Sequence, residues 1–134
     1  DSVKAAIGEK GLESCVFWQK KAPQYQMKGV YQQADFFLLP TEYEIFGMVL
    51  LEAMFFRRVV LTTPNGGADM LLRSGENGLV LKKSDPTRWA KALLDTAADP
   101  EKKARMEQAA YETVIHENTW DALADRFLAV YEKR

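Results

Sequence analysis

Short apolar runs alternate with helical patterns along most of the chain. Residues 36–39, 59–63 and 79–82 are almost entirely apolar. Such continuous runs are typical of strands that are covered on both faces, as in a parallel sheet. Residues 15–18 (Cys-Val-Phe-Trp) predict a further short, buried strand near the N-terminus.

The segments between these runs predict helices. We expect helices over residues 3–10, 25–33, 47–57 and 68–73. Gly11 is a suitable stop for the first, because glycine accepts the left-handed backbone that often ends a helix.

The last third of the chain predicts three more helices. Asp85-Pro86 and Asp99-Pro100 each supply an N-cap followed by proline at the first helical position. Asn118 or Thr119 starts a third helix, with apolar residues along one stripe at Trp120, Leu123, Phe127, Leu128 and Tyr131. Alternating strands and helices followed by a helical tail predict an α/β fold with a parallel sheet.

The segment from Pro40 to Met54 carries the clearest candidate chemistry. Pro40 ends the strand at 36–39, and a helix then opens near Gly47. The first amides of that helix have no intrahelical acceptor, so they form an anion site just past the carboxyl end of a strand. Glycine allows a phosphate to approach closely, which suits a nucleoside diphosphate.

The same segment resembles the Glu-x7-Glu signature of retaining glycosyltransferases with the GT-B fold, the group 1 or GT4-like family. The family pattern is a strand, Pro-Ser/Thr-x-x-Glu-x-Phe-Gly, four apolar residues, Glu-Ala-Met, a strand, Gly-Gly and Gly-x-Asn-Gly. This chain matches with Pro40-Thr41, Glu44, Phe46-Gly47, Glu52-Ala53-Met54, Gly66-Gly67 and Gly75-Glu76-Asn77-Gly78. The resemblance extends from about Gly11 to the C-terminus.

The resemblance implies a single domain over residues 1–134, a truncated nucleotide-sugar-binding domain with a partial, Rossmann-like parallel sheet. The first βα units of that domain and an N-terminal acceptor domain would lie outside it. The intact enzyme would transfer a sugar from a nucleoside diphosphate sugar to a hydroxyl acceptor with retention of anomeric configuration. This piece alone would be inactive.

The resemblance also assigns roles to two glutamates. Glu44 would be catalytic, since the family's first glutamate reaches the sugar and stabilises its developing positive charge. Glu52 would accept hydrogen bonds from the ribose hydroxyls. From the residues alone, Glu44 is equally a capping carboxylate, and Glu52 is a helix residue that could pair with Arg57 or Arg58.

Further donor-binding residues follow from the same resemblance. Backbone amides of Phe46, Gly47 and Met48 would bind the diphosphate, and Gly66 and Gly67 would line the cleft near the sugar. The nucleobase would lie near three residues at the end of the first strand: Trp18, Gln19 and Lys20. The resemblance implies that the N-terminus of the helix near Gly47, together with an arginine and a lysine from the family's first βα units, neutralises the diphosphate. We therefore expect no metal and no cofactor.

Two departures from the family pattern leave other functions open. Arg57-Arg58-Val59 stands where the family has Gly-x-Pro, and Met70 replaces an acidic residue after Gly-Gly. The alternatives are a catalytically silent sugar-nucleotide-binding or interaction module, and a GT-B sugar-nucleotide epimerase. His116, the only histidine, is badly placed for the acid/base work of an epimerase.

Composition restricts the partners. A net charge of −1 gives no basic footprint for nucleic acid, and no apolar run approaches the ~18 residues of a membrane span. The only cysteine, Cys15, excludes an internal disulfide and is expected to be a buried thiol. We expect a cytoplasmic location, with membrane-peripheral attachment open for the full-length protein. The exposed edge of the first strand would favour self-association.

Overall fold

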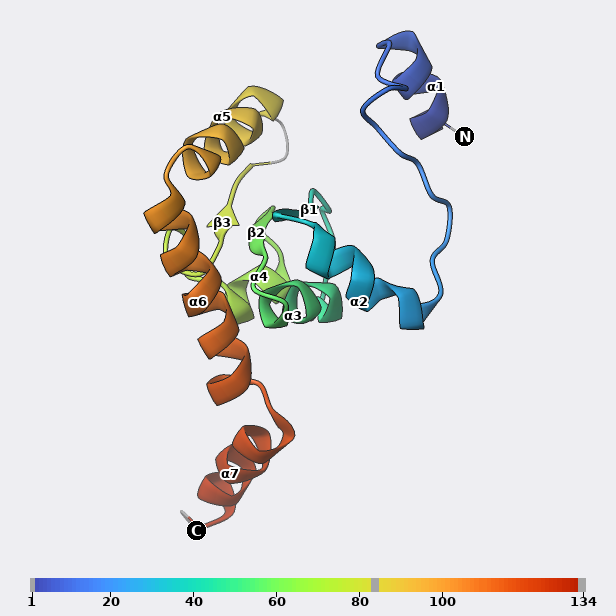
Figure 1. The fold of residues 1–134 in the computed structure, drawn as a ribbon. Helices are drawn as coiled ribbons and strands as arrows, with labels where there is room; N and C mark the ends of the chain where they lie inside the picture. Colours follow the sequence, from blue (N-terminus) through green and yellow to red (C-terminus); the bar gives the residue numbers. More distant parts are fainter. Residues whose placement is uncertain (1, 83–84, 133–134) are drawn as a thin grey trace.

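A computed structural model describes residues 2–82 and 85–132 of the 134-residue chain. The first half of the fold contains α1 (Ser2–Glu9), α2 (Gln24–Gln33), β1 (Phe36–Leu39), α3 (Met48–Phe55) and β2 (Val59–Thr62). The second half contains α4 (Gly66–Leu71), β3 (Leu79–Val80), α5 (Pro86–Ala97), α6 (Pro100–Glu117) and α7 (Trp120–Tyr131). Figure 1 shows the sheet between α3 and α5, with α6 running along one side.

The described strands form one parallel sheet in the order β1-β2-β3. β1 pairs with β2 from Phe36↔Val59 to Leu39↔Thr62, and β2 pairs with β3 at Leu61↔Leu79. This confirms the predicted α/β class and parallel sheet, and the helical tail is also present. β3 is shorter than the predicted 79–82, although the amide of Leu81 still donates to the carbonyl of Thr62 at 2.8 Å.

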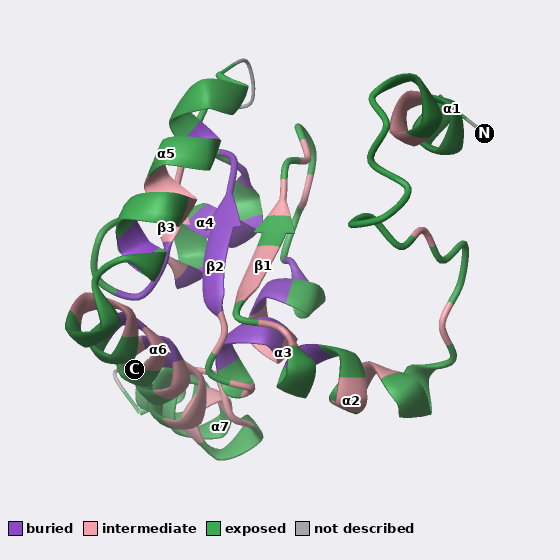
Figure 2. Ribbon diagram, turned by 45° about the horizontal axis from the view of Figure 1, so that its top comes forward, coloured by how far each residue is buried: buried purple, intermediate pink, exposed green. Residues whose placement is uncertain are grey.

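The core lies on both faces of β2, which is completely buried (Figure 2). On one face Val60 packs with Leu50 and Met54 of α3, and on the other Val59 and Leu61 pack with Met106 of α6. Successive side chains of a strand point to opposite faces, so a strand buried on both needs an unbroken apolar run. The apolar run at residues 59–63 therefore predicted a strand that is buried on both faces.

Three helix starts follow the predicted capping residues. Asp85, Asp99 and Thr119 each accept a hydrogen bond from the backbone amide three residues on, at 2.9, 2.9 and 3.2 Å. Of the two candidates for the last cap, Thr119 is therefore the N-cap, and Asn118 ends α6.

Arg57 ends α3 in a left-handed conformation, with φ of 58°. The amide of Arg57 donates to the carbonyl of Met54, and that of Arg58 to the carbonyl of Ala53, both at 2.9 Å. This paired pattern is the Schellman motif, which usually has glycine at the left-handed position. The departure from the family pattern at residues 57–58 therefore preserves the helix stop.

The predicted strand at residues 15–18 is wrong. No strand forms there, and the side chain of Phe17 is 93% exposed. Cys15 is also exposed, which corrects the expectation of a buried thiol. Figures 1 and 2 show why: α1 and the chain after it lie apart from the sheet, so this run has no neighbouring strand to pair with.

The tail helix α7 also lies largely in solvent. It extends beyond the end of α6 (Figure 1), and Trp120, Phe127 and Tyr131 of its apolar stripe are between 65% and 87% exposed. Within residues 2–82 and 85–132, no helix combines the length and apolar character needed to cross a membrane.

Candidate functional site

Two loops meet at the carboxyl edge of the sheet. Residues 40–47 lead from the end of β1 into α3, and residues 63–65 lead from the end of β2 into α4. Because the two strands are parallel, both loops leave the same edge, which confirms the expected position of Glu44 and Gly47. Ligands of doubly wound folds bind at this edge.

The start of α3 is built around Gly47. This residue has φ of 78° and is the helix N-cap, so the left-handed conformation requires glycine. Its amide donates to Oε1 of Glu44 at 3.0 Å. Within the described residues, the amides of Met48 and Val49 have no acceptor. The helix start therefore presents free donors beside a carboxylate that already occupies one of them.

The start of α4 lies directly against the loop that carries Glu44. A Cβ added at Gly66 would lie 2.7 Å from the carbonyl oxygen of Ile45, and one at Gly67 would lie 2.5 Å from that of Phe46. Real side chains do not approach backbone so closely, so both positions need glycine. The Gly-Gly pair thus allows the two loops to form one surface.

Threonine and asparagine side chains fasten the two loops together. The hydroxyl of Thr62 donates to the carbonyl of Leu39 at 2.9 Å, and the hydroxyl of Thr63 donates to the carbonyl of Thr41. The Asn65 side chain donates to the carbonyl of Thr63 and accepts from the amide of Ala68, both at 2.9 Å. Asn65 is therefore the N-cap of α4. An asparagine directly before Gly-Gly is the sequence signal that indicates this role.

Glu52 points toward α2 rather than toward either arginine after α3. Its Oε2 accepts from the hydroxyl of Tyr31 at 3.0 Å, and its Oε1 accepts from the side-chain amide of Gln24 at 3.4 Å. Arg57 instead lies over the ring of Tyr111, 4.1 Å from its centroid. Arg58 donates to backbone carbonyls of α2's C-cap and of Phe56.

The contact between Tyr31 and Glu52 is not predictable from local sequence patterns, because 21 residues separate the two. The available signal was weak: an aromatic residue on the apolar side of a short helix. Burial, followed by the hydrogen bond to Glu52 and the charge of Glu52, raises the pKa of Tyr31 above its ordinary value. The phenol therefore remains a proton donor at neutral pH.

Trp18, Gln19 and Lys20 are not brought to this edge. Trp18 is half-buried, with the ammonium of Lys4 4.9 Å from its ring centroid, and Gln19 and Lys20 are exposed. In Figures 1 and 2 this part of the chain runs separately from the sheet. The structure thus assembles Glu44, Gly47, Gly66 and Gly67 in one place, with Glu52 further along α3.

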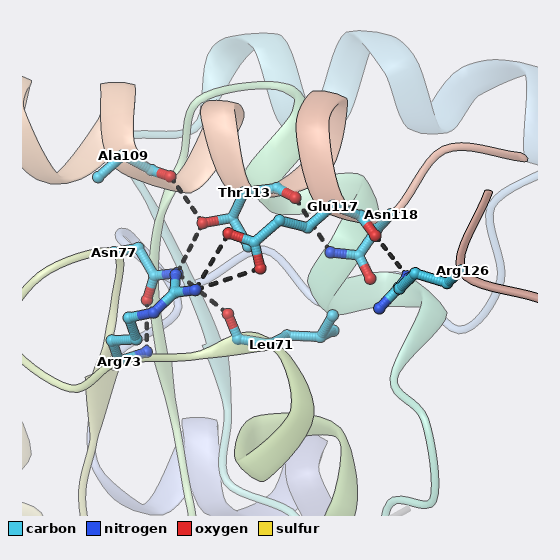
Figure 3. Close-up of polar contacts among 8 residues, drawn as sticks. All are labelled: Leu71, Arg73, Asn77, Ala109, Thr113, Glu117, Asn118 and Arg126. Carbon is cyan, nitrogen blue, oxygen red and sulfur yellow. Dashed lines mark hydrogen bonds and ion pairs between the residues drawn. The ribbon is translucent and has the colours of Figure 1, made fainter. Parts of the chain in front are cut away.

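The Gly-x-Asn-Gly motif lies at the opposite edge, immediately before β3. Asn77 is buried: its side chain donates to the carbonyl of Leu71 and to the hydroxyl of Thr113, both at 3.0 Å, and accepts from the amide of Arg73 (Figure 3). Arg73 pairs with Glu117 at 3.0 Å beside it. This network attaches the turn to α6, so we assign the motif a structural role.

The remaining candidates do not form a metal or acid/base centre. His116 is exposed in the last turn of α6. Among the residues that the structure describes, no group of three His, Cys, Asp or Glu side chains could hold a metal ion.

Comparisons with known proteins identify relatives of this arrangement. A family model described as "Glycosyl transferases group 1" matches residues 1–113. D-inositol 3-phosphate glycosyltransferase from Corynebacterium jeikeium is 31% identical over 125 residues, which cover 93% of this chain and 30% of the relative.

Solved structures show the same fold. Sucrose-phosphate synthase from Thermosynechococcus elongatus aligns with a TM-score of 0.85 at 24% identity, over 98% of this chain and 33% of that one. The Anabaena protein HepE in complex with UDP-glucose aligns with a TM-score of 0.78 at 22% identity, over 99% of this chain and 36% of that one. The chain thus spans about 30% of the length of the curated relative.

Proposed function

Because this chain belongs to the group 1 glycosyltransferase family, we propose that it is the C-terminal, donor-binding part of a retaining GT-B enzyme. Residues 1–134 form a single truncated domain in this proposal. The intact enzyme transfers a sugar from a nucleoside diphosphate sugar to a hydroxyl acceptor with retention of configuration. The acceptor, a glycan, lipid or small molecule, binds to a domain outside this chain.

The observation that carries the proposal is the helix start beside Glu44. The amides of Phe46, Gly47 and Met48 bind the diphosphate, because a helix N-terminus carries a partial positive charge and unpaired donors. Glu44 now occupies the amide of Gly47 at 3.0 Å. An arriving phosphate competes for that donor and repels the carboxylate, so Glu44 turns toward the sugar when the donor binds.

Glu44 then acts on the reacting carbon. Its carboxylate accepts hydrogen bonds from sugar hydroxyls and stabilises the positive charge that develops as the diphosphate leaves. Gly66 and Gly67 pack against the backbone of the Glu44 loop, so the start of α4 joins that loop in one surface, without intervening side chains, beside the sugar. Glu52 accepts hydrogen bonds from the ribose hydroxyls. The segment around Trp18, Gln19 and Lys20 contacts the nucleobase in the intact enzyme, where the first βα units of the domain are present.

The relatives support a nucleotide-sugar donor. The Anabaena structure is described as a complex with UDP-glucose, and the Corynebacterium relative as a glycosyltransferase.

The proposal requires no metal and no cofactor, because amides and upstream cations neutralise the leaving diphosphate. It places the intact protein in the cytoplasm, free or at a membrane surface. The chain by itself transfers no sugar. Since no strand forms at residues 15–18, self-association uses the unpaired edge of β1 instead.

Two substitutions in the intact enzyme, this chain together with its upstream domains, test these roles. Glu44→Ala should lower kcat by about 10²–10³-fold with little change in donor affinity, because Glu44 senses charge only in the transition state. Glu52→Ala should weaken donor binding by about 10- to 100-fold, since each hydrogen bond to a charged group contributes substantially. Glu76→Gln, an exposed glutamate at the other sheet edge, is the control. Wild-type kinetics for both site variants would refute the site.

Met70 favours a second candidate function, a catalytically silent binding module. It lies 65% exposed on α4, where the family pattern has an acidic residue. Donor binding without transfer in the intact protein, with transfer gained in Met70→Glu, would support this candidate. Transfer by the unchanged protein would exclude it.

A further inference from the structure

The carboxylate of Glu52 is held from outside its own helix. Both of its hydrogen-bond donors come from α2: Tyr31 contacts Oε2 at 3.0 Å and Gln24 contacts Oε1 at 3.4 Å. Each carboxylate oxygen therefore accepts one hydrogen bond. A carboxylate has about four acceptor positions, so room remains on both oxygens for further donors.

Tyr31 is fixed more firmly than Glu52 itself. Only 2% of Tyr31 is exposed. Its ring stacks on Phe56 with centroids 5.6 Å apart and planes at 12°, and it meets Phe37 at 5.9 Å. Packing on two sides leaves the phenol one orientation, so its hydroxyl is a fixed point against which the flexible glutamate is oriented.

The chemical type of the donor also matters. An arginine would hold the carboxylate by a bidentate ion pair and use much of its capacity. A neutral phenol hydroxyl orients Glu52 and leaves its full negative charge. Both arginines that follow α3 are engaged elsewhere, with Gln108 and Tyr111 for Arg57 and with backbone carbonyls for Arg58.

We propose that Tyr31 is a positioning residue that holds Glu52 ready for the ribose hydroxyls of the nucleotide, with Gln24 as a second, weaker donor. This inference rests on the proposed function, because it requires Glu52 to bind ribose. It adds that α2, which carries no residue of the family motif, strengthens the preference for ribose that Glu52 confers.

Binding of ADP, GDP and UDP to the intact enzyme, each compared with its 2′,3′-dideoxy form, tests the inference. The ratio of the two affinities isolates the ribose hydroxyls from the base and the diphosphate. For the nucleotide that binds most tightly, Tyr31→Phe should weaken the ribose form by about three- to tenfold and leave the dideoxy form unchanged. KM for the sugar donor should rise while kcat changes little.

Three further variants complete the design. Tyr111→Phe, a half-buried tyrosine on α6 that does not contact Glu52, is the matched control and should leave the ratio unchanged. Glu52→Gln should remove most of the ribose preference, and Tyr31→Phe should add nothing in the Glu52→Gln background. Gln24 is exposed, so Gln24→Ala keeps the fold and should reduce the ratio by about twofold. It carries the test if Tyr31→Phe does not fold.

The results distinguish a failure of the ribose-binding role of Glu52 from a failure of the positioning role of Tyr31. If Glu52→Gln keeps the full ribose preference, the proposed role of Glu52 is wrong. If Glu52→Gln loses the preference but Tyr31→Phe weakens both nucleotide forms equally, or neither, the positioning role is wrong and Tyr31 only packs. With Gln24→Ala as the test variant, an unchanged ratio overturns it.

Discussion

Two four-residue apolar runs in this chain have opposite fates. Residues 36–39 form β1, which pairs along its whole length with β2, whereas residues 15–18 form no strand and leave Phe17 93% exposed. Their compositions are similar. The difference is the neighbour: β2 follows β1 through one short βα unit, while no strand in the described chain lies beside residues 15–18.

The comparison shows that an apolar run states only that a segment should be buried, not what will bury it. Backbone groups of a strand are satisfied only across a ladder, and an isolated strand has none. In the proposed intact enzyme, the first βα units outside this chain would supply such neighbouring strands. In the described chain this run stays exposed because no strand lies beside it.

The largest expected difference between the two regions is in stability. Leu50 is fully buried against Val60. Leu50→Ala should lower the free energy of unfolding by about 2–5 kcal/mol, because the lost contacts leave a cavity. Leu12→Ala, in the exposed N-terminal segment, should stay within about 0.5 kcal/mol. Urea unfolding of both variants of this chain measures the difference. Equal costs would mean that the N-terminal segment belongs to the cooperative core.

Hydrogen exchange should separate the two runs nearly as strongly. In this chain, amides of residues 15–18 should exchange at close to the rate of an unfolded peptide, while those of β2 should be protected by at least about 100-fold. In the intact enzyme the first run should gain comparable protection, because its neighbouring strands are present. Exchange that stays fast in the intact enzyme would contradict the proposal that strands outside this chain pair with residues 15–18.

Alanine substitutions at Gly67 and at Gly8 should give a smaller difference in stability. Gly67→Ala should destabilise the chain by about 1–3 kcal/mol, because the new Cβ would meet the backbone of Phe46. Gly8→Ala lies in α1, where the nearest atom is 3.6 Å away, so it should slightly increase the helix content of α1. Thermal unfolding followed by circular dichroism measures both effects. A neutral Gly67→Ala would show that the two loops can separate without cost.

The smallest expected effect concerns an ion pair that anchors β1. Asp35, directly before β1, lies 2.6 Å from Lys103 of α6, and the hydrogen bond and charge of Lys103 lower the pKa of Asp35. A lowered pKa contributes stability above the unfolded value of about 3.9, and this contribution disappears as pH falls through the folded value. Asp35→Asn should therefore lower Tm by at most about 4 °C at pH 7, and the difference should vanish at low pH.

The exposed Lys91–Asp95 pair, 2.8 Å apart within α5, supplies the control. Asp95→Asn should change Tm less than Asp35→Asn does, because an exposed pair within one helix contributes little. If the two variants behave alike at every pH, the pair at the start of β1 has no anchoring role.

Several features were predictable because their causes are local. A proline after aspartate fixes a helix start, so Asp85 and Asp99 were identified as caps. The continuous apolar runs at β1 and β2 predicted buried parallel strands. The position of Gly47 at the start of α3 followed from a strand end, a polar loop and an apolar helix in succession.

Other features depend on contacts between residues far apart, and these only the tertiary structure decides. The hydrogen bond from Tyr31 to Glu52 spans 21 residues, and the approach of Gly67 to Phe46 joins two loops. Residues 15–18 show the same limit, since their apolar run predicted a strand but no described strand lies beside it. Local sequence determines propensity, caps and which segments seek burial, because those energies arise within a few residues. Pairing, orientation and exposure arise between elements, so they are decided only when the elements pack.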